Sequence, residues 1–377
     1  MQDRKFGKAD FQPSALGFGC MRLPTTGDSA SIDEAEAIRM IRHAIDNGLN
    51  YVDTAYGYHG GNSERVVGKA LQDGYRERVK LATKLPPWNV TTAADFDRIF
   101  NDQLQKTQSD KIDLYLLHSL SKDSWHKLRD LGALQWAERQ MAKGRIGYLG
   151  FSFHDSLEVF KEIVDAYDWT FCQIQYNLLN EDVQAGMEGL EYAASKGLGV
   201  VIMEPLLGGR LARPPRSIAD LYNSADPNRT PTDWALQWLW DKPEVSVVLS
   251  GMSTMQQVEE NLASAARSGV GSLSQAERNL LRQVQEKYAA LHPIPCTGCE
   301  YCLPCPEGVN IPRIFAIYNE GMAYEEMAQA RERYARLPAD QWGSLCEQCR
   351  RCEGLCPQHI EISDWIERVH TELAPSS

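Results

Sequence analysis

Three apolar, strand-like runs in the first third of the chain are each followed at once by a polar side chain. These side chains are Asp53, Lys84 and His118, and Tyr58 lies five residues beyond the aspartate. A carbonyl that accepts a hydride needs a proton for the alkoxide that develops. A tyrosine has a pKa of about 10, which a nearby ammonium lowers, so a lysine beside a tyrosine is suited to deliver that proton. The set predicts acid catalysis at a reduced carbonyl.

Each residue has its own part in that prediction. Lys84 lowers the pKa of the tyrosine hydroxyl, Asp53 pairs with Lys84, and His118 donates a hydrogen bond to the substrate oxygen. Taken singly, the aspartate is more often a helix cap, the lysine a solvated charge and the histidine a core residue. Three such endings on consecutive strands favour a shared site, because the carboxyl ends of barrel strands meet at one rim.

Eight of the ten cysteines lie in two runs near the end of the chain. The second run has the spacing of bacterial ferredoxins for a [4Fe–4S] cluster, and the first is one residue shorter before its last cysteine. The last cysteine of such a run usually ligates the other cluster. We therefore expect two ligand sets: Cys296, Cys299, Cys302 and Cys356 for one cluster, and Cys346, Cys349, Cys352 and Cys305 for the other.

Zinc and disulfide bonds are the alternatives to iron–sulfur clusters for these cysteines. Zinc sites built from four cysteines prefer two separated C-x2-C pairs rather than runs of four. Disulfide scaffolds belong to short exported chains, whereas this chain has 377 residues and begins without an apolar signal segment. Iron–sulfur clusters are the favoured prediction. Cys20 and Cys172 stand alone and are expected to be packed strand residues.

Strand-like runs alternate with segments of helical periodicity over residues 1–290. The predicted strands are 49–52, 79–83, 112–117, 146–151, 171–175, 199–203 and 245–249, with one more near 15–19. The predicted helices are 31–48, 63–72, 93–107, 131–143, 156–166, 183–196 and 232–241, and Ser31 and Glu34 form a capping box on the first. This alternation predicts an α/β fold, a (β/α)8 TIM barrel.

The pattern changes after Ser274. A helix is predicted from there to about Leu291, where two prolines break it. We place the domain boundary near residue 290, with the barrel over 1–290 and a small, mainly α-helical domain over 291–377. Helical periodicity at 311–319 and 324–336 separates the two cysteine runs.

The net charge and the hydropathy limit which classes of partner the chain is expected to have. The formal net charge is −12 at pH 7, which argues against nucleic acid or an anionic membrane surface as the main partner. No stretch approaches the roughly 18 consecutive apolar residues of a transmembrane helix, so membrane insertion is not expected. The expected location is the cytoplasm.

The chain resembles the aldo-keto reductase family over roughly residues 4–270. The resemblance is carried by the segments 14–19, 53–58 and 62–65 and by the pairs Thr83-Lys84 and Leu117-His118. It implies reduction of an aldehyde or ketone, or oxidation of an alcohol, with a nicotinamide dinucleotide. Because the family places the acid five residues after the aspartate, it implies Tyr58 as the acid and Tyr56 as a pocket wall or packing residue.

The same resemblance implies a nicotinamide site at the carboxyl ends of later strands. Ser152 and Gln173 are implied to hold the carboxamide. The family usually has asparagine after that serine, where this chain has Phe153. It often stacks an aromatic residue on the nicotinamide from the end of strand seven, and this chain has Met203 there. The implied contacts at that place are Met203, Pro205 and Leu206.

The adenosine-phosphate site is implied on a late segment, by Gly251, Gln257, Glu260 and Asn261. Members specific for NADPH carry basic residues where Gly251 and Gln257 stand, and a 2′-phosphate prefers such partners. NADP(H) and NAD(H) therefore both stay open, with Arg210 or a base on another loop as a substitute. No separate flavin motif is present, although barrels bind flavin without one.

The C-terminal part resembles the α-helical dicluster ferredoxin domains found beside succinate dehydrogenases, so the chain resembles the aldo-keto reductase subgroup fused to such a domain. Nicotinamide delivers two electrons, whereas each cluster normally carries one. The clusters are therefore expected to serve a ferredoxin-like partner or the structure. The alternative is an electron-transfer or partner-binding protein whose barrel is a docking or sensing scaffold. The substrate of the leading hypothesis is a small carbonyl compound or alcohol.

Overall fold

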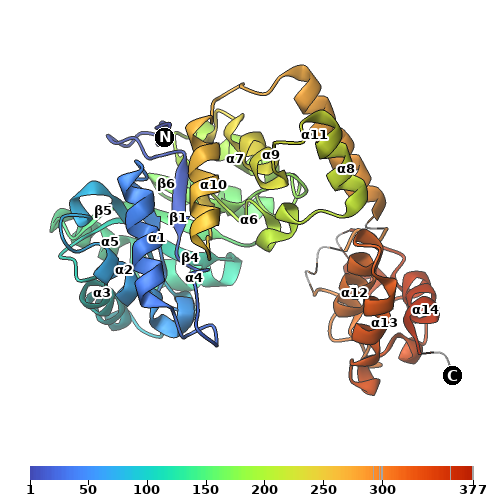
Figure 1. Ribbon diagram of the computed structural model, residues 1–377. Coiled ribbons are helices and arrows are strands. Elements are labelled where there is room, and N and C mark those ends of the chain that lie inside the picture. The colour runs from blue at the N-terminus through green and yellow to red at the C-terminus, as the bar shows by residue number, and fades with distance from the viewer. Residues whose placement is uncertain (292, 297, 299, 357, 376–377) are drawn as a thin grey trace. The chain divides into compact units, whose positions relative to one another are not determined.

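The computed structural model describes residues 1–291, 293–296, 298, 300–356 and 358–375. The chain divides into two compact units, one of Met1–Ala212 with Thr232–Leu273 and one of Arg213–Pro231 with Ser274–Ser377. Figure 1 labels their elements along the chain. The domain boundary predicted near residue 290 stays a prediction.

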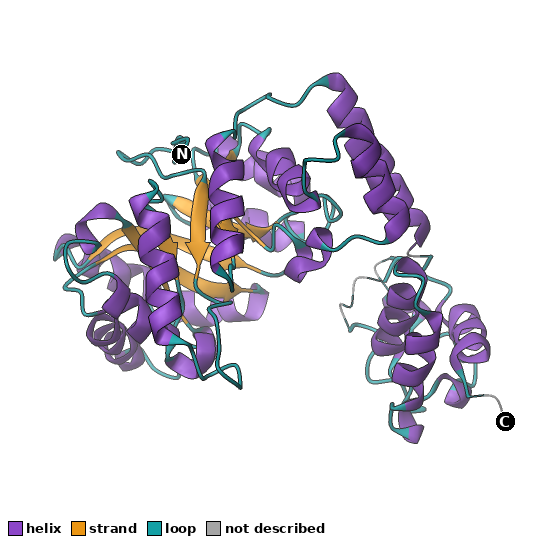
Figure 2. Ribbon diagram, in the orientation of Figure 1, coloured by secondary structure: helices purple, strands orange, loops and turns teal. Residues whose placement is uncertain are grey.

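Eight parallel strands close into a barrel in the first unit, in the order β1 to β8. They are β1 Leu16–Gly19, β2 Tyr51–Asp53, β3 Lys80–Leu85, β4 Ile112–Leu120, β5 Ile146–Phe153, β6 Phe171–Gln175, β7 Gly199–Met203 and β8 Val245–Ser250. The predicted (β/α)8 barrel is confirmed. Figure 2 shows the strands enclosed by helices within this unit.

The barrel interior is filled by apolar side chains from alternate strand positions, as a barrel buried on both faces requires. These include Tyr51, Leu114, Phe171 and Val247, and Phe6 from the N-terminal segment joins the same cluster. Phe6 packs tightly enough that a Cβ on Gly199 would lie 2.8 Å from its ring. The core therefore depends on a residue outside the eight strands.

The helices between strands mostly match the predicted segments. They are α1 Glu34–Asp46, α2 Ser63–Ala70, α3 Ala94–Thr107, α4 Lys122–Asp130, α5 Ala133–Ala142, α6 Leu157–Ala166, α7 Gly186–Ser195, α9 Pro231–Trp240 and α10 Met255–Ala266. The capping box predicted for the first helix is wrong. The Asp33 carboxylate caps α1 instead, because it accepts a hydrogen bond from the backbone N–H of Glu36 at 3.1 Å.

Five strands, β2, β3, β4, β5 and β8, extend past their predicted ends, and two of these extensions include residues of the predicted site. β3 continues through Lys84, which is aligned with Leu116 of β4. β4 continues to Leu120, with an irregularity after Leu117 that includes Ser119 at a φ of +51°. Lys84 and His118 consequently lie within the last residues of their strands rather than after them. Strand pairing fixes Lys84, whereas His118 lies at the irregularity between Leu117 and Leu120, which are both paired with β5. Support from paired residues makes the site more rigid than a loop.

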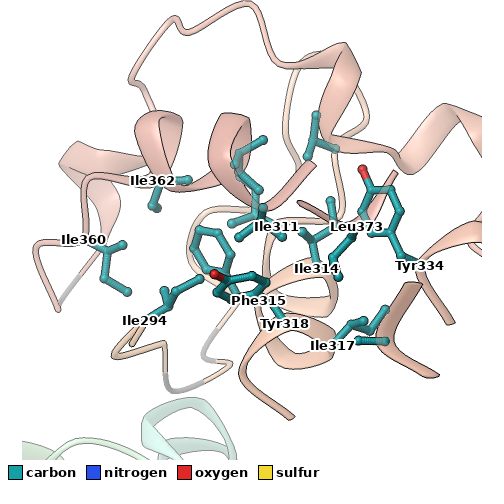
Figure 3. Close-up of a cluster of buried hydrophobic side chains, with 14 residues drawn as sticks. Ile294, Ile311, Ile314, Phe315, Ile317, Tyr318, Tyr334, Ile360, Ile362 and Leu373 are labelled. Atoms are coloured by element: carbon teal, nitrogen blue, oxygen red, sulfur yellow. The ribbon is translucent and has the colours of Figure 1, made fainter. Parts of the chain in front are cut away.

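The second unit is helical among its described residues. It contains α8 Arg216–Ala225, α11 Gln275–Leu291, α12 Ile311–Ala323, α13 Met327–Ala335 and α14 Ile362–Leu373. The last three surround an apolar core that Figure 3 shows, with Phe315 and Tyr318 near its centre. None of the described helices in either unit combines the length and the apolar character that a membrane crossing needs.

Candidate active site

A fully buried ion pair stands at the carboxyl ends of β2 and β3. The Lys84 ammonium donates hydrogen bonds to both carboxylate oxygens of Asp53, at 2.6 and 2.8 Å, and to the backbone carbonyl of Thr54 at 2.8 Å. Lys84 is 0% and Asp53 2% exposed. A charge pair this deep in a protein is stable only when its partners hold it from several sides, which these contacts do.

Tyr58 is brought to this ion pair, and Tyr56 is not. The Lys84 ammonium lies 3.5 Å from the Tyr58 hydroxyl and 5.0 Å from the centre of its ring. The ring of Tyr56 lies instead against the ammonium of Lys106 on α3, at 3.9 Å. Of the two tyrosines in this loop, Tyr58 alone is placed for proton transfer beside Lys84.

Burial dominates the protonation of this group. It raises the pKa of Tyr58 above its ordinary value, and Lys84 offsets only part of that rise. The net lowering expected from the sequence is therefore wrong in sign, because desolvation of the phenolate outweighs the ammonium. Burial lowers the pKa of Lys84. Asp53 and Tyr58 together raise it by more than burial lowers it, so the net shift is upward. At neutral pH the lysine is charged and the tyrosine protonated.

His118 lies beside Tyr58. Their rings meet edge to face with centroids 6.1 Å apart, and the ring of Trp88 lies 5.0 Å from that of His118. Burial, then the charge of Lys84 and then His154, holds the pKa of His118 well below its ordinary range. The imidazole is therefore neutral at physiological pH. Its Nδ1 is buried without a hydrogen-bond partner among the described residues.

A polar network that the sequence analysis missed lies behind Lys84. Gln103 of α3 donates hydrogen bonds to the backbone carbonyl of Lys84 and to the Glu64 carboxylate, both at 2.9 Å, and accepts one from Tyr115 at 2.7 Å. Thr83 also donates to Glu64, at 2.6 Å. These residues are far apart in sequence, so only the fold reveals that they fix the end of β3.

The residues assigned to the nicotinamide carboxamide are side by side. Ser152 of β5 is aligned with Gln173 of β6 in the parallel register. The Gln173 amide donates to the Met203 sulfur at 3.5 Å, and its own oxygen is buried without a partner among the described residues. Ser152 accepts a hydrogen bond from the Ser119 N–H at 2.7 Å. A free buried acceptor suits the N–H of a carboxamide.

The two remaining residues assigned near the nicotinamide follow β7. Pro205 is buried and Leu206 is half-buried. Both are apolar, as the wall of a site for a flat ring requires.

The residues assigned to the adenosine phosphate lie after β8 and on α10. The Asn261 amide donates to Ser250 at 2.9 Å, and Gln257 accepts from the Ser253 N–H at 2.8 Å. Glu260 accepts from Gln256 at 2.7 Å. Gly251 is the first residue after the end of β8. These residues are gathered in one place but contribute no positive charge.

The first expected cysteine set shares a cavity. Cys296, Cys302 and Cys356 line it together with apolar side chains that include Phe315 and Ile360. Cys356 comes from the second run and the other two from the first, so the fold brings cysteines of the two runs together. The fourth expected ligand, Cys299, lies outside the described residues.

The second set also combines both runs. Cys305, Cys346 and Cys352 pack against the core of the second unit. Burial raises the pKa of Cys352 to about 11, with added contributions from the charges of Glu353, Cys346 and Cys305. Cys349 is exposed. Within the described ranges, no group of three or more acidic, histidine or cysteine side chains is arranged to hold a single metal ion.

Both isolated cysteines are packed, as expected, but only Cys172 lies in a strand, β6; Cys20 follows the end of β1. Cys20 and Cys172 are fully buried, and burial raises the pKa of each well above the range of a reactive thiol.

Comparisons with known proteins identify the first unit. The model of the aldo/keto reductase family matches residues 15–269. An aldo-keto reductase from Bacillus halodurans is 29% identical, with a TM-score of 0.64 over 75% of this chain and 96% of its own. One from Klebsiella pneumoniae, solved in complex with NADPH, is 25% identical, with a TM-score of 0.60 over 76% of this chain and 96% of its own. The uncharacterized oxidoreductase YqkF of Bacillus subtilis is 27% identical over 70% of this chain and 91% of its own.

Proposed function

Since the chain belongs to the aldo/keto reductase family and is an oxidoreductase, we propose that its barrel reduces a small aldehyde or ketone with NADP(H) or NAD(H), or oxidises the corresponding alcohol. The observation that carries this proposal is the Lys84–Asp53 ion pair with its ammonium 3.5 Å from the Tyr58 hydroxyl. Nothing in a purely structural ion pair requires a phenol hydroxyl beside its ammonium. The roles of the individual site residues are part of the same proposal.

Tyr58 is the proton donor of this site. Its raised pKa keeps it protonated until the alkoxide develops, and the Lys84 ammonium then stabilises the phenolate that the transfer leaves. Asp53 keeps Lys84 charged and oriented. The neutral imidazole of His118 donates a hydrogen bond to the substrate oxygen and so orients the carbonyl toward Tyr58.

The cofactor that fits this barrel is a nicotinamide dinucleotide, which supplies the hydride when bound. The residues that hold it are Ser152 and Gln173 at the carboxamide and Met203 at the ring. The unpartnered Gln173 oxygen supports this assignment, because a buried acceptor without a donor costs free energy that a bound carboxamide N–H restores. The NADPH complex of the Klebsiella pneumoniae relative supports the choice of cofactor.

The test is turnover of a panel of aldehydes and ketones with NADPH and NADH by the wild type, Y58F and Y56F. We expect Y58F to lower kcat/KM by about 10²- to 10⁴-fold, the contribution of a positioned general acid. Y56F removes a hydroxyl from the same loop, where the ring lies 3.9 Å from the Lys106 ammonium rather than beside Lys84, and should retain most activity. Carbonyl turnover that survives Y58F would overturn the catalytic assignment.

We further propose that the second unit holds two [4Fe–4S] clusters. Each thiolate of such a cluster ligates a different iron, so its ligands lie further apart than those around one ion. A cavity lined by Cys296, Cys302 and Cys356 supports the first cluster, because it joins the two runs in the expected way. The packing of Cys305, Cys346 and Cys352 against one apolar core, although they come from both runs, supports the second.

The clusters need a separate electron path from the hydride site. A [4Fe–4S] cluster carries one electron at a time and a hydride carries two, so we propose that the clusters exchange electrons with a ferredoxin-like partner or stabilise the second unit. A flavin has no specific support among the described residues. The scaffold alternative is not favoured, because a docking barrel has no need of a proton donor beside a buried ammonium.

A further inference from the structure

The residue that follows the proposed proton donor has a strained backbone. His59 has a φ of +52°, and the next two residues, Gly60 and Gly61, have φ values of +63° and +91°. Glycine adopts such values freely, whereas a residue with a Cβ is strained there. Strained residues of this kind persist only where their surroundings hold them, and they cluster at functional sites. The proposed function gives His59 no part, so its presence in this turn needs an explanation.

Both ring nitrogens of His59 are held by the loop that follows β1. Nδ1 lies 2.5 Å from the backbone carbonyl oxygen of Ser29, and Nε2 lies 3.2 Å from the backbone nitrogen of Leu23. A carbonyl only accepts and a backbone N–H only donates, so Nδ1 carries the proton and Nε2 is the acceptor. In this tautomer the ring joins two points of the loop to the turn that carries Tyr58.

The loop after β1 has its own internal support. Thr25 and Ile32 pair across it as an antiparallel bridge. The Asp28 carboxylate accepts hydrogen bonds from the backbone N–H groups of Ala30 and Ser31, at 2.8 and 2.9 Å. These bonds fix the backbone groups that contact the imidazole, so the loop is a rigid support for the turn.

The turn and the loop also meet away from the imidazole. The Asn62 amide donates a hydrogen bond to the Ala30 carbonyl at 3.1 Å. A Cβ on Gly60 would lie 3.3 Å from the Ala30 Cβ, so the two segments are in close contact. Tyr58 is the first residue of this turn. The distance of 3.5 Å between its hydroxyl and the Lys84 ammonium therefore depends on how the turn is held.

We propose that His59 is a positioning residue that holds the turn carrying Tyr58 against the loop after β1, and so sets the distance between the Tyr58 hydroxyl and the Lys84 ammonium. The inference rests on the proposed function. A misplacement of about 1 Å at a reacting group lowers a rate by the order of 10²-fold. Because both of its ring nitrogens are occupied by the loop, His59 acts through Tyr58 and takes no part in the proton transfer itself.

The test compares the single-turnover rate of carbonyl reduction, and the KM values for carbonyl and dinucleotide, in the full-length wild type, H59G, Y58F and H59G/Y58F. Glycine adopts the same φ, so H59G removes the ring contacts without straining the turn. We expect H59G to lower the rate by about 10- to 100-fold and to leave both KM values within about twofold. In the Y58F background the same change should alter the rate by less than about twofold, because the hydroxyl that His59 positions is already gone.

Two further variants complete the test. Asparagine tolerates this φ, and its amide nitrogen takes the place of Nδ1 toward the Ser29 carbonyl, so H59N should recover part of the rate that H59G loses. H126N is the matched control. It changes a histidine of α4 that pairs with Glu162, and we expect it to leave the rate unchanged.

Two results would overturn the inference while the proposed function stands. In the first, H59G keeps the rate within about twofold of the wild type. In the second, H59G lowers the rate by the same factor with and without the Tyr58 hydroxyl, which would make its role merely structural. A wild type that reduces no carbonyl with either dinucleotide would instead contradict the proposed function, and the inference with it.

Discussion

At the scale of single residues, the proposed role of Tyr58 as proton donor predicts how the reaction depends on pH. Burial raises its pKa above the ordinary value of about 10. Because reduction needs the protonated phenol, we expect kcat/KM for reduction to stay level through neutral pH and to fall only as the pH passes that raised value. Alcohol oxidation needs the phenolate and should rise over the same alkaline range.

The pH profiles of kcat/KM in both directions, measured with saturating dinucleotide, check this expectation. His118 is not expected to add a limb near pH 6.5, because burial holds its pKa well below that range. A reduction profile that falls through about pH 6 to 7 and is lost in H118A would show that the histidine, not Tyr58, donates the proton.

The Lys84–Asp53 pair also makes a prediction about stability. Removing one partner leaves the other charge buried, so K84M or D53N should lower the free energy of unfolding by about 3–5 kcal/mol. The matched control is K69M, which breaks an exposed ion pair with Glu34 and should cost less than about 1 kcal/mol. Urea unfolding of the three variants tests this, and equal losses in K84M and K69M would contradict it.

At the scale of elements, the strands were predictable because each is a short apolar run between helical segments. Their ends were not. From the sequence, Lys84 and His118 were predicted to follow the ends of their strands. The pairing of β3 with β4, and of β4 with β5, extends the two strands past these positions. The cap of α1 was missed because Asp33 competes with Ser31 two positions earlier, and the choice depends on how the loop approaches the helix.

Several helices follow patterns that the sequence prediction did not include. In α14 the apolar residues Ile362, Ile366, Val369 and Leu373 repeat at helical spacing and fill the core of the second unit. That spacing was a usable signal. The network of Gln103 with Glu64 carried no such signal, because its members sit on separate elements and meet only in the folded barrel.

Close packing of strands against each other gives an element-scale prediction at Gly150 of β5. A Cβ there would lie 2.6 Å from the ring of Phe171, which is fully buried and has no room to move. We expect G150A to lower the free energy of unfolding by about 1–3 kcal/mol through overpacking. G27A places its methyl in open space and should leave stability nearly unchanged. Denaturant midpoints that coincide for the two variants would contradict this packing.

At the scale of the whole molecule, the two cysteine runs are proposed to share their ligands. If they do, C302S/C356S damages a single cluster and keeps about half of the iron, although the two residues are in different runs. C302S/C346S also replaces two cysteines by serine, but it damages both clusters and should lose nearly all of the iron. Iron and acid-labile sulfide, measured on anaerobically purified protein, distinguish the two.

Loss of nearly all the iron in both double variants would show that each run closes on itself, because residues 302 and 356 would then belong to different clusters. In that case C302S/C356S loses both clusters. The spacing of the eight cysteines predicts the sharing of ligands, which stays a prediction, and the cavity at Cys296, Cys302 and Cys356 supports it.

The barrel is proposed to transfer a hydride directly to a carbonyl carbon. This proposal is tested by supplying the intact protein with NADPH or NADH carrying deuterium at the transferred position, in ordinary water, together with the best carbonyl substrate of the panel. Mass spectrometry of the alcohol should show one deuterium on the carbinol carbon. An alcohol with no deuterium on that carbon would mean that electrons and solvent protons reach the substrate separately, which would contradict the account.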